Sequence, residues 1–179
     1  MNLRPVRQAV FLDRDGVINR AFVKNGKPFP PASLAAFEFL PGVESAALAL
    51  RRAGFLIVVV TNQPDVATGL QAREVVESMH KKLHAAAICD DIKVCYHTDD
   101  DACECRKPKP GMLLEAAKEW QIDLQRSFIV GDRWRDVAAG KAAGCKTFFI
   151  DYRYSEQSAE LPDAVVASLE EAAKIILQF

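Results

Sequence analysis

Short apolar runs alternate regularly along this chain with longer segments of helical spacing. Five runs typical of strands cover residues 8–12, 55–60, 91–95, 127–130 and 147–150. Segments with the apolar spacing of amphipathic helices cover residues 43–53, 72–87, 110–120 and 134–143, and a last helix begins at residue 168. Strands that alternate with helices predict an α/β fold built on a doubly wound parallel sheet.

The length of the chain favours one folded unit. With 179 residues it can bury a single core of ordinary size, and no repeat, linker or low-complexity tract divides it. We therefore expect one domain over residues 1–179. The segment 20–31 contains Pro28, Pro30 and Pro31, so we expect an irregular loop there.

Charge and hydropathy limit the classes of partner. The formal net charge of −1 provides no bulk attraction to nucleic acid or to an anionic membrane. No apolar run approaches the roughly 20 residues that span a bilayer, and residues 1–7 lack the apolar core of a secretory signal. The odd number of cysteines, five, does not suit a disulfide framework. We expect a cytoplasmic monomer that acts on a small molecule.

Polar residues follow the predicted strands at the point where each strand ends. The first strand is followed by Asp13-Arg14-Asp15-Gly16 and the second by Thr61-Asn62-Gln63. Further along the chain come Arg106-Lys107-Pro108 and Gly131-Asp132-Arg133. In open α/β sheets, ligands bind beyond the carboxyl ends of the strands. We therefore expect these side chains to meet at one edge of the sheet.

The types of these residues suit phosphoryl transfer. Asp13 and Asp15 lie two residues apart, so their side chains point the same way and repel unless a cation or a shared proton lies between them. Asp132 adds a third carboxylate, and carboxylate oxygens are the ligands that Mg²⁺ prefers. Transfer of a phosphoryl group also needs a nucleophile and hydrogen-bond donors, which Asp13, Thr61 and Lys107 supply.

Taken singly, these residues have structural explanations. A D-x-D pair is common in turns, and in glycosyltransferases it binds a nucleotide-sugar metal, although no nucleotide-binding glycine loop accompanies it here. Thr61 could bond to the backbone at a strand end, and Asp132 could cap the following helix. Only the joint arrangement favours phosphoryl transfer.

Four motifs occur in the order found in the haloacid dehalogenase superfamily of phosphatases. They are Phe11-Leu12-Asp13-Arg14-Asp15-Gly16-Val17-Ile18-Asn19, Val60-Thr61-Asn62-Gln63, Lys107-Pro108 and Val130-Gly131-Asp132. The resemblance covers nearly the whole chain and is strongest to the branch that holds heptose-bisphosphate and histidinol-phosphate phosphatases. It implies a central sheet in which the strands, numbered along the chain, are ordered 3-2-1-4-5.

The same resemblance implies a role for each motif residue. Asp13 is expected to be the nucleophile, which forms an aspartyl-phosphate intermediate, and Asp15 the general acid and base. Asp13, the main-chain carbonyl of Asp15 and Asp132 are expected to hold Mg²⁺, with Asp136 as an outer partner. Thr61 and Lys107 are expected to stabilise the transferred phosphoryl group.

Three cysteines and a histidine gather between the third strand and Lys107. Cys95, His97, Cys103 and Cys105 lie within residues 95–105. Three thiolates and one imidazole suit a closed tetrahedral Zn²⁺ site, which has a structural role because no position is left for water. The branch named above carries a zinc loop of this pattern. We expect zinc to stiffen the segment that presents Arg106 and Lys107 to the substrate.

The other cysteines and histidines are not expected to bind metal. Cys89 and Cys145 are expected to be packing residues. His80 and His84 lie four residues apart on one predicted helix, but no acidic third ligand is evident, so we expect both to be exposed.

No interval between the motifs is long enough for the cap domain that larger relatives carry. Specificity must therefore come from loops around an open site. The candidate substrate contacts in these loops are Asn19, Lys24, Asn62, Gln63, Arg106 and Arg133. The cations among them favour a substrate with a second negative group. The resemblance implies that this substrate is heptose 1,7-bisphosphate, hydrolysed at the 7-phosphate.

One loop departs from the pattern of the heptose-bisphosphate enzymes. Residues 64–68 read Pro-Asp-Val-Ala-Thr, where those enzymes usually have Ser-Gly-Ile-Ala-Arg. The change leads us to expect the α-anomer of the substrate. Histidinol phosphate, or another small sugar phosphate, is the alternative substrate, and a non-catalytic module stabilised by zinc is the alternative from a different class.

Overall fold

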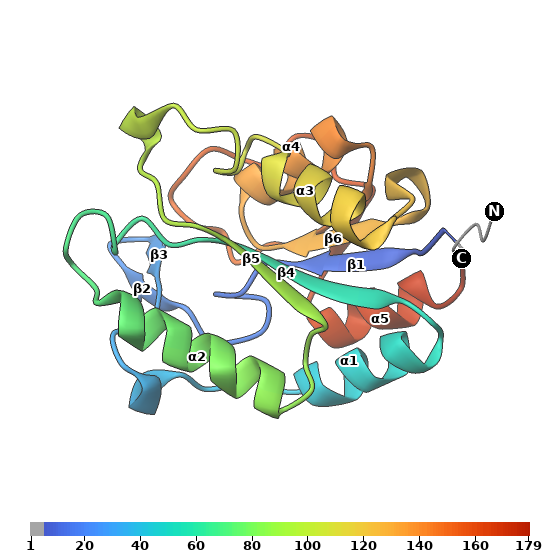
Figure 1. Ribbon diagram of the computed structural model, residues 1–179, viewed down its shortest axis with the longest axis horizontal. Helices are drawn as coiled ribbons and strands as arrows, with labels where there is room; N and C mark the ends of the chain where they lie inside the picture. Colours follow the sequence, from blue (N-terminus) through green and yellow to red (C-terminus); the bar gives the residue numbers. More distant parts are fainter. Residues whose placement is uncertain (1–5) are drawn as a thin grey trace.

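A six-stranded parallel sheet forms the centre of the molecule. The computed structural model describes residues 6–179 (Figure 1). The sheet order is β5-β4-β1-β6-β7-β8. Its strands are β1 (Ala9–Leu12), β4 (Leu56–Asn62), β5 (Asp91–Cys95), β6 (Phe128–Gly131), β7 (Lys146–Ile150) and β8 (Ala164–Val166). The first five residues lie outside the described part, and with them most of the segment for which we predicted no secretory signal.

The predicted doubly wound fold is confirmed. The five predicted strands correspond to β1, β4, β5, β6 and β7, and they pair in the expected order. All neighbouring pairs in this sheet are parallel; Phe11, for example, is in register with Val58 on one side and Ile129 on the other. The short strand β8 extends the sheet beyond the prediction.

Helices cover both faces of the sheet (Figure 1). They are α1 (Val43–Arg52), α2 (Arg73–Ala85), α3 (Gly111–Trp120), α4 (Trp134–Ala143) and α5 (Leu169–Ile176), with short 3-10 helices η1 (Leu34–Ala36), η2 (Asp99–Asp101) and η3 (Leu124–Arg126). Successive side chains of β1 point to opposite faces. Val10 and Leu12 join the core under α1, α2 and α5, and Ala9 and Phe11 join the core under α3 and α4.

The segment 20–31 corrects one prediction. We expected an irregular loop, but the chain forms an antiparallel hairpin from β2 (Phe22–Lys24) and β3 (Lys27–Phe29). Asn25 and Gly26 have φ angles of 52° and 74°, the left-handed conformation that a two-residue hairpin turn requires. Pro28 is tolerated because the hairpin has only two strands, so a missing N–H can face away from the partner strand.

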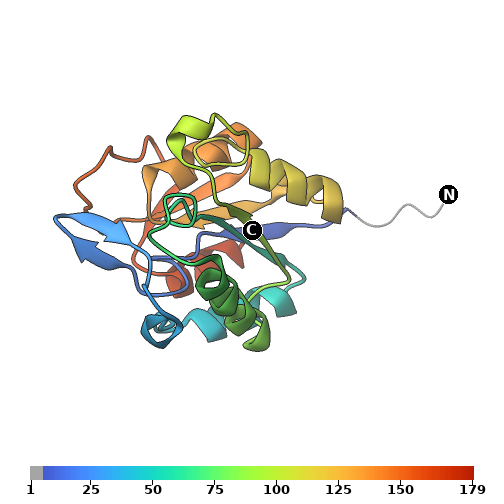
Figure 2. The ribbon, with the colours of Figure 1, turned by 60° about the vertical axis from the view of Figure 1, so that its left-hand side comes forward.

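The hairpin β2–β3 lies at the carboxyl end of the parallel strands, opposite the end of the sheet at which β1 begins (Figure 2). No separate cap domain covers this end within residues 6–179. Among the helices of the same range, none is long and apolar enough to cross a membrane.

Candidate active site

Two strand ends bring the acidic residues together. Asp13 follows β1, and its backbone N–H donates to the carbonyl oxygen of Val130 in β6 at 3.0 Å. Asp132 follows β6 directly. Between them lies Gly16, which has a φ of +89°, and a Cβ atom there would lie 2.0 Å from Oδ2 of Asp132. Only glycine allows this close approach of the two segments.

Asp13, Asp132 and Asp136 form a buried carboxylate cluster. Each offers an oxygen within 4.8 Å of the others. Burial raises the pKa of Asp13 to about 6, an effect that the nearby Lys107 opposes. Burial and the neighbouring Asp13 and Asp136 also raise the pKa of Asp132 well above its ordinary value. Such a cluster favours any cation that can share the three carboxylates.

Lys107 already neutralises part of this charge. Its Nζ atom lies 3.0 Å from Oδ1 of Asp13, 2.6 Å from Oδ1 of Asp136 and 2.7 Å from the Val60 carbonyl oxygen. Burial alone would lower the pKa of Lys107, but the two carboxylates raise it above the ordinary value. The lysine is therefore held charged beside the predicted nucleophile.

The cluster fits a divalent cation. Three carboxylates outnumber the one lysine, and Oδ1 of Asp132 is buried without a hydrogen-bond partner. A buried carboxylate oxygen is stable only with a donor or a cation beside it. The predicted ligands Asp13 and Asp132 are both in this group. The side chain of Asp15 lies outside this group. Asp136, which we expected only as an outer partner, belongs to it.

The Asp15 carboxylate is instead surrounded by donors. It accepts hydrogen bonds from Arg14 (Nη2 to Oδ2, 2.9 Å), Asn19 (Nδ2 to Oδ1, 2.9 Å) and Gln63 (Nε2 to Oδ2, 2.8 Å). Gln63 also donates to Oγ1 of Thr61 at 2.9 Å. Asn19 and Gln63 were predicted to contact substrate, but both are buried and neither lines the pocket. They orient Asp15 and Thr61.

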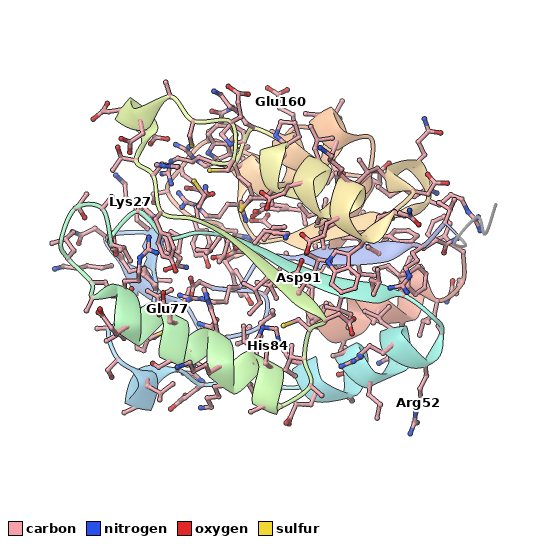
Figure 3. The ribbon with its side chains drawn as sticks, in the orientation of Figure 1. Lys27, Arg52, Glu77, His84, Asp91 and Glu160 are labelled. Atoms are coloured by element: carbon pink, nitrogen blue, oxygen red, sulfur yellow. The ribbon has the colours of Figure 1, made fainter. Side chains whose placement is uncertain are left out.

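His80 corrects a further expectation. We predicted an exposed side chain, but His80 is only partly exposed, and its Nε2 lies 3.2 Å from Nη1 of the fully buried Arg14. Burial and the charge of Arg14 lower the pKa of His80 to about 4. Its neighbour His84, labelled on α2 in Figure 3, is exposed as predicted.

An open pocket with a cavity volume of about 160 Å³ lies over these residues. Among the predicted site residues, it is lined by Asp13, Asp15, Thr61, Asn62, Lys107 and Arg133. The remaining lining comes from Pro28, Phe29, Pro30, Pro64, Asp65, Arg135 and Asp136. Lys24, a predicted contact, is exposed on β2 and is not part of the lining.

Arg106, which we expected to contact the substrate, does not line this pocket, whereas Arg135 does. Asp99 of the zinc loop binds both guanidinium groups, with 2.9 Å from Arg106 Nε and 2.8 Å from Arg135 Nη1 to its Oδ1. These hydrogen bonds lower the pKa of Asp99 to about 2. Sequence reasoning missed Arg135, although its position on the first turn of α4, directly after the Asp132 motif, was a usable signal.

The segment after β7 also reaches the site, and no sequence pattern indicated this. The Tyr152 hydroxyl donates to the Gly16 carbonyl oxygen at 3.0 Å, and the Tyr154 hydroxyl donates to Oδ2 of Asp132 at 2.8 Å. Glu156 forms an ion pair with Arg133, which therefore lines the pocket with its charge already matched. We call residues 152–156 the tyrosine strap.

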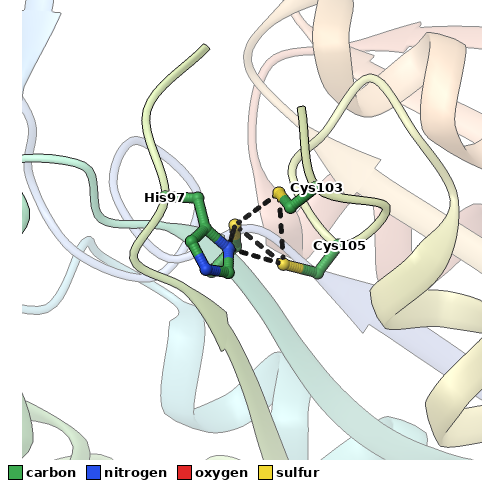
Figure 4. Close-up of side chains that lie close together, drawn as sticks. His97, Cys103 and Cys105 are labelled. Atoms are coloured by element: carbon green, nitrogen blue, oxygen red, sulfur yellow. Dashed lines mark hydrogen bonds between the residues drawn. The ribbon is translucent and has the colours of Figure 1, made fainter. Parts of the chain in front are cut away.

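The zinc prediction is matched by the geometry of its four residues (Figure 4). Sγ of Cys105 lies 3.0 Å from Sγ of Cys95, 3.5 Å from Sγ of Cys103 and 3.3 Å from Nδ1 of His97. Zinc–ligand bonds of about 2.0–2.3 Å in a tetrahedron place the ligand atoms slightly farther apart than this. The four residues could hold Zn²⁺ with a small outward movement.

Known proteins are similar to this chain in both sequence and fold. Residues 104–172 match a family model described as HAD-hydrolase-like. The D-glycero-beta-D-manno-heptose-1,7-bisphosphate 7-phosphatase of Rhodopseudomonas palustris is 38% identical, with 80% of this chain and 83% of that protein covered. The protein of the same name from Vibrio cholerae is 35% identical, with 96% and 97% covered.

Among solved structures, that of the D,D-heptose 1,7-bisphosphate phosphatase from B. bronchiseptica, complexed with magnesium and phosphate, is similar. It has a TM-score of 0.80 and 30% sequence identity, and the match covers 96% of this chain and 98% of that one. The identities and coverage far exceed what a shared fold alone requires. The chain therefore belongs to the heptose-bisphosphate phosphatase family of haloacid dehalogenase-like enzymes, and it is a phosphoric monoester hydrolase.

Proposed function

We propose that this enzyme removes the 7-phosphate of D-glycero-D-manno-heptose 1,7-bisphosphate in a Mg²⁺-dependent reaction. The observation that carries the proposal is the convergence of Asp13, Asp15, Thr61 and Lys107 in one pocket beside a buried carboxylate cluster. The names of the relatives supply the substrate. We further propose that residues 1–179 form one catalytic domain, which acts as a cytoplasmic monomer without nucleic acid or membrane as partner.

Asp13 begins the reaction in this proposal. A carboxylate oxygen of Asp13 attacks phosphorus, the bond from phosphorus to the sugar oxygen breaks, and Asp15 supplies a proton to that oxygen. Asp15 then takes a proton from water, which attacks the aspartyl phosphate and releases inorganic phosphate and Asp13. Lys107 and Thr61 donate to the phosphoryl oxygens throughout.

Asp13 and Asp132, with Asp136 and the main-chain carbonyl of Asp15 nearby, would hold the Mg²⁺. The bound ion supplies positive charge against the phosphoryl oxygens. The buried, unpartnered Oδ1 of Asp132 and the excess of carboxylates support this assignment. The zinc site formed by Cys95, His97, Cys103 and Cys105 would hold the loop that carries Asp99.

The walls of the pocket suit a sugar with a second phosphate. Phe29 and its neighbouring prolines present apolar atoms, and Arg133 and Arg135 present cations. Of these cations, Arg135 is the contact that we propose for the 1-phosphate, because a guanidinium binds phosphate through paired hydrogen bonds. An anion there would compete with Asp99 for Arg135.

The anomer follows the relatives and not our sequence-based expectation. We expected the α-anomer because of the altered loop 64–68. Thr68 is exposed and does not line the pocket, so its replacement of an arginine gives no support to that choice. The relatives are named for the β-anomer. We propose the β-anomer.

Histidinol phosphate is the second candidate substrate, and one residue favours it. Asp65 lines the pocket, and burial together with the charge of Asp15 raises its pKa. A carboxylate in this position would attract the cationic group of histidinol phosphate and repel a second phosphate. Arg133 and Arg135 act in the opposite sense.

A phosphate-release assay separates the candidates. The value of kcat/KM should be measured for both anomers of the heptose bisphosphate, for heptose 7-phosphate and for histidinol phosphate. We expect the β-bisphosphate to give the highest value, with release of the 7-phosphate only. A tenfold or larger preference for histidinol phosphate, on the order of 1.4 kcal/mol, would replace the heptose assignment.

A further inference from the structure

Tyr154 makes an unusual contact with the carboxylate cluster. The two oxygens of Asp132 have different surroundings: Oδ2 accepts a hydrogen bond from the Tyr154 hydroxyl at 2.8 Å, and Oδ1 is buried without a partner. No other hydrogen bond to this side chain is present within residues 6–179. The phenol is therefore the one group that fixes the rotation of the carboxylate and decides which oxygen stays free.

The position of Tyr154 is set independently of Asp132. Its ring packs against that of Tyr152, with ring centroids 5.6 Å apart. On either side of it, the Tyr152 hydroxyl donates to the Gly16 carbonyl oxygen and the Ser155 N–H donates to the Gly26 carbonyl oxygen at 2.8 Å. The strap is thus anchored to two other segments, so the hydroxyl is presented to Asp132 by a fixed support.

We propose that Tyr154 is a positioning residue for the metal site: its hydroxyl holds Oδ2 of Asp132 so that Oδ1 faces the shared space between Asp13 and Asp136. Groups that hydrogen-bond to a metal ligand orient it, and their removal typically weakens metal binding by about 10–100-fold. The inference rests on the proposed magnesium site and not on the identity of the substrate.

The test compares Tyr154→Phe with Tyr152→Phe. Both variants remove one hydroxyl from the same strap and leave the rings, but only the first removes the donor to Asp132. Calorimetric titration with MgCl₂, in the absence of any substrate, measures the Kd of the zinc-loaded protein for Mg²⁺. We expect Tyr154→Phe to raise this Kd by about 10–100-fold and Tyr152→Phe to change it by less than about threefold.

Kinetics then separate positioning from catalysis. In Tyr154→Phe the Mg²⁺ concentration for half-maximal activity should rise with the Kd, while kcat at saturating Mg²⁺ stays within about threefold of wild type. Zinc content should not change. An unchanged Kd in a folded Tyr154→Phe protein, or an equal rise in Tyr152→Phe, would overturn the inference. A wild-type protein that binds no Mg²⁺ would overturn it together with the magnesium site, whereas failure of the heptose assay would leave it intact.

Discussion

The two candidate metal sites are built in opposite ways. The zinc ligands come from one short stretch, residues 95–105, and are partly exposed. The carboxylates Asp13, Asp132 and Asp136 are all buried and come from two segments, because Asp13 lies more than a hundred residues before the other two. The first site can form wherever its loop closes, but the second exists only after the parallel sheet has assembled. We therefore expect loop stiffness to depend on one site and chemistry on the other.

The two sites also differ in how completely their own residues satisfy the ligand groups. Lys107 lies among the carboxylates and neutralises part of their charge, and one oxygen of Asp132 has no partner. The thiol cluster has four ligands and needs no further group to complete a tetrahedron. The carboxylate site is thus suited to an exchangeable ion and the thiol site to a resident one.

Asp13→Asn should abolish turnover without changing the zinc site. The amide is neither a nucleophile nor an anionic metal ligand, so we expect kcat to fall by at least about a thousandfold. Zinc content and thermal midpoint should match wild type. Steady-state phosphate release and elemental analysis provide the measurements. Activity within about tenfold of wild type would exclude the aspartyl-phosphate route.

Cys103→Ala should disrupt the zinc site and reduce turnover much less than Asp13→Asn. Loss of one of four ligands leaves an incomplete coordination sphere, so zinc should fall from about one per chain to a small fraction, with a lower thermal midpoint. KM should rise because Asp99 and its bound Arg135 lose their support, and kcat should fall much less than in Asp13→Asn. Cys145→Ala is the control, because Cys145 is a buried thiol outside the cluster; this variant should retain about one zinc per chain. Full zinc occupancy in Cys103→Ala would contradict the four-ligand site.

Arg135→Ala should weaken selection for the second phosphate. Losing a charge-assisted contact costs about 1.5–3 kcal/mol, so kcat/KM for the bisphosphate should fall by about ten- to a hundredfold, with little change for heptose 7-phosphate. Arg106→Ala is the matched control, because Arg106 shares Asp99 but does not line the pocket. If Arg106→Ala has the larger effect on the bisphosphate, the assignment of Arg135 fails and our original expectation is restored.

His80→Gln should change the acid sensitivity of the fold by a small amount. The pKa of folded His80 is about 4, against an unfolded value of 6.5. The unfolded chain therefore binds more protons between these values, and stability is lost as pH falls from about 6.5 toward 4. One such proton contributes at most about 1.4 kcal/mol per pH unit.

Urea unfolding at about pH 7 and about pH 5 measures this slope. His80→Gln should reduce it, because glutamine can still accept from Arg14 without taking up a proton. His84→Gln, an exposed position on the same helix, is the control and should not change it. An unchanged slope in His80→Gln would show that acid sensitivity arises elsewhere.

Much of this protein could be read from the order of its residues. Alternating apolar and helical segments predicted the sheet and its helices, because periodicity follows directly from the geometry of each element. The ends of parallel strands meet at one edge, so Asp13, Thr61 and Lys107 line one pocket and Asp132 lies beside Asp13. The zinc ligands were readable because they are neighbours in sequence. Their roles in catalysis and metal binding remain our proposals.

The directions of the other polar side chains could not be predicted from the sequence, because they depend on contacts between distant segments. Asp99 lies between Arg106 and Arg135, and it is Arg135 that lines the pocket. Asn19 and Gln63 were predicted to contact the substrate, but their side-chain amides donate hydrogen bonds to the Asp15 carboxylate. A polar side chain turns toward a buried charged group that can still form a hydrogen bond. Packing between distant segments determines which charged groups lie within reach. A tyrosine 22 residues beyond Asp132 can thus fix its carboxylate, although no local pattern in the sequence connects the two.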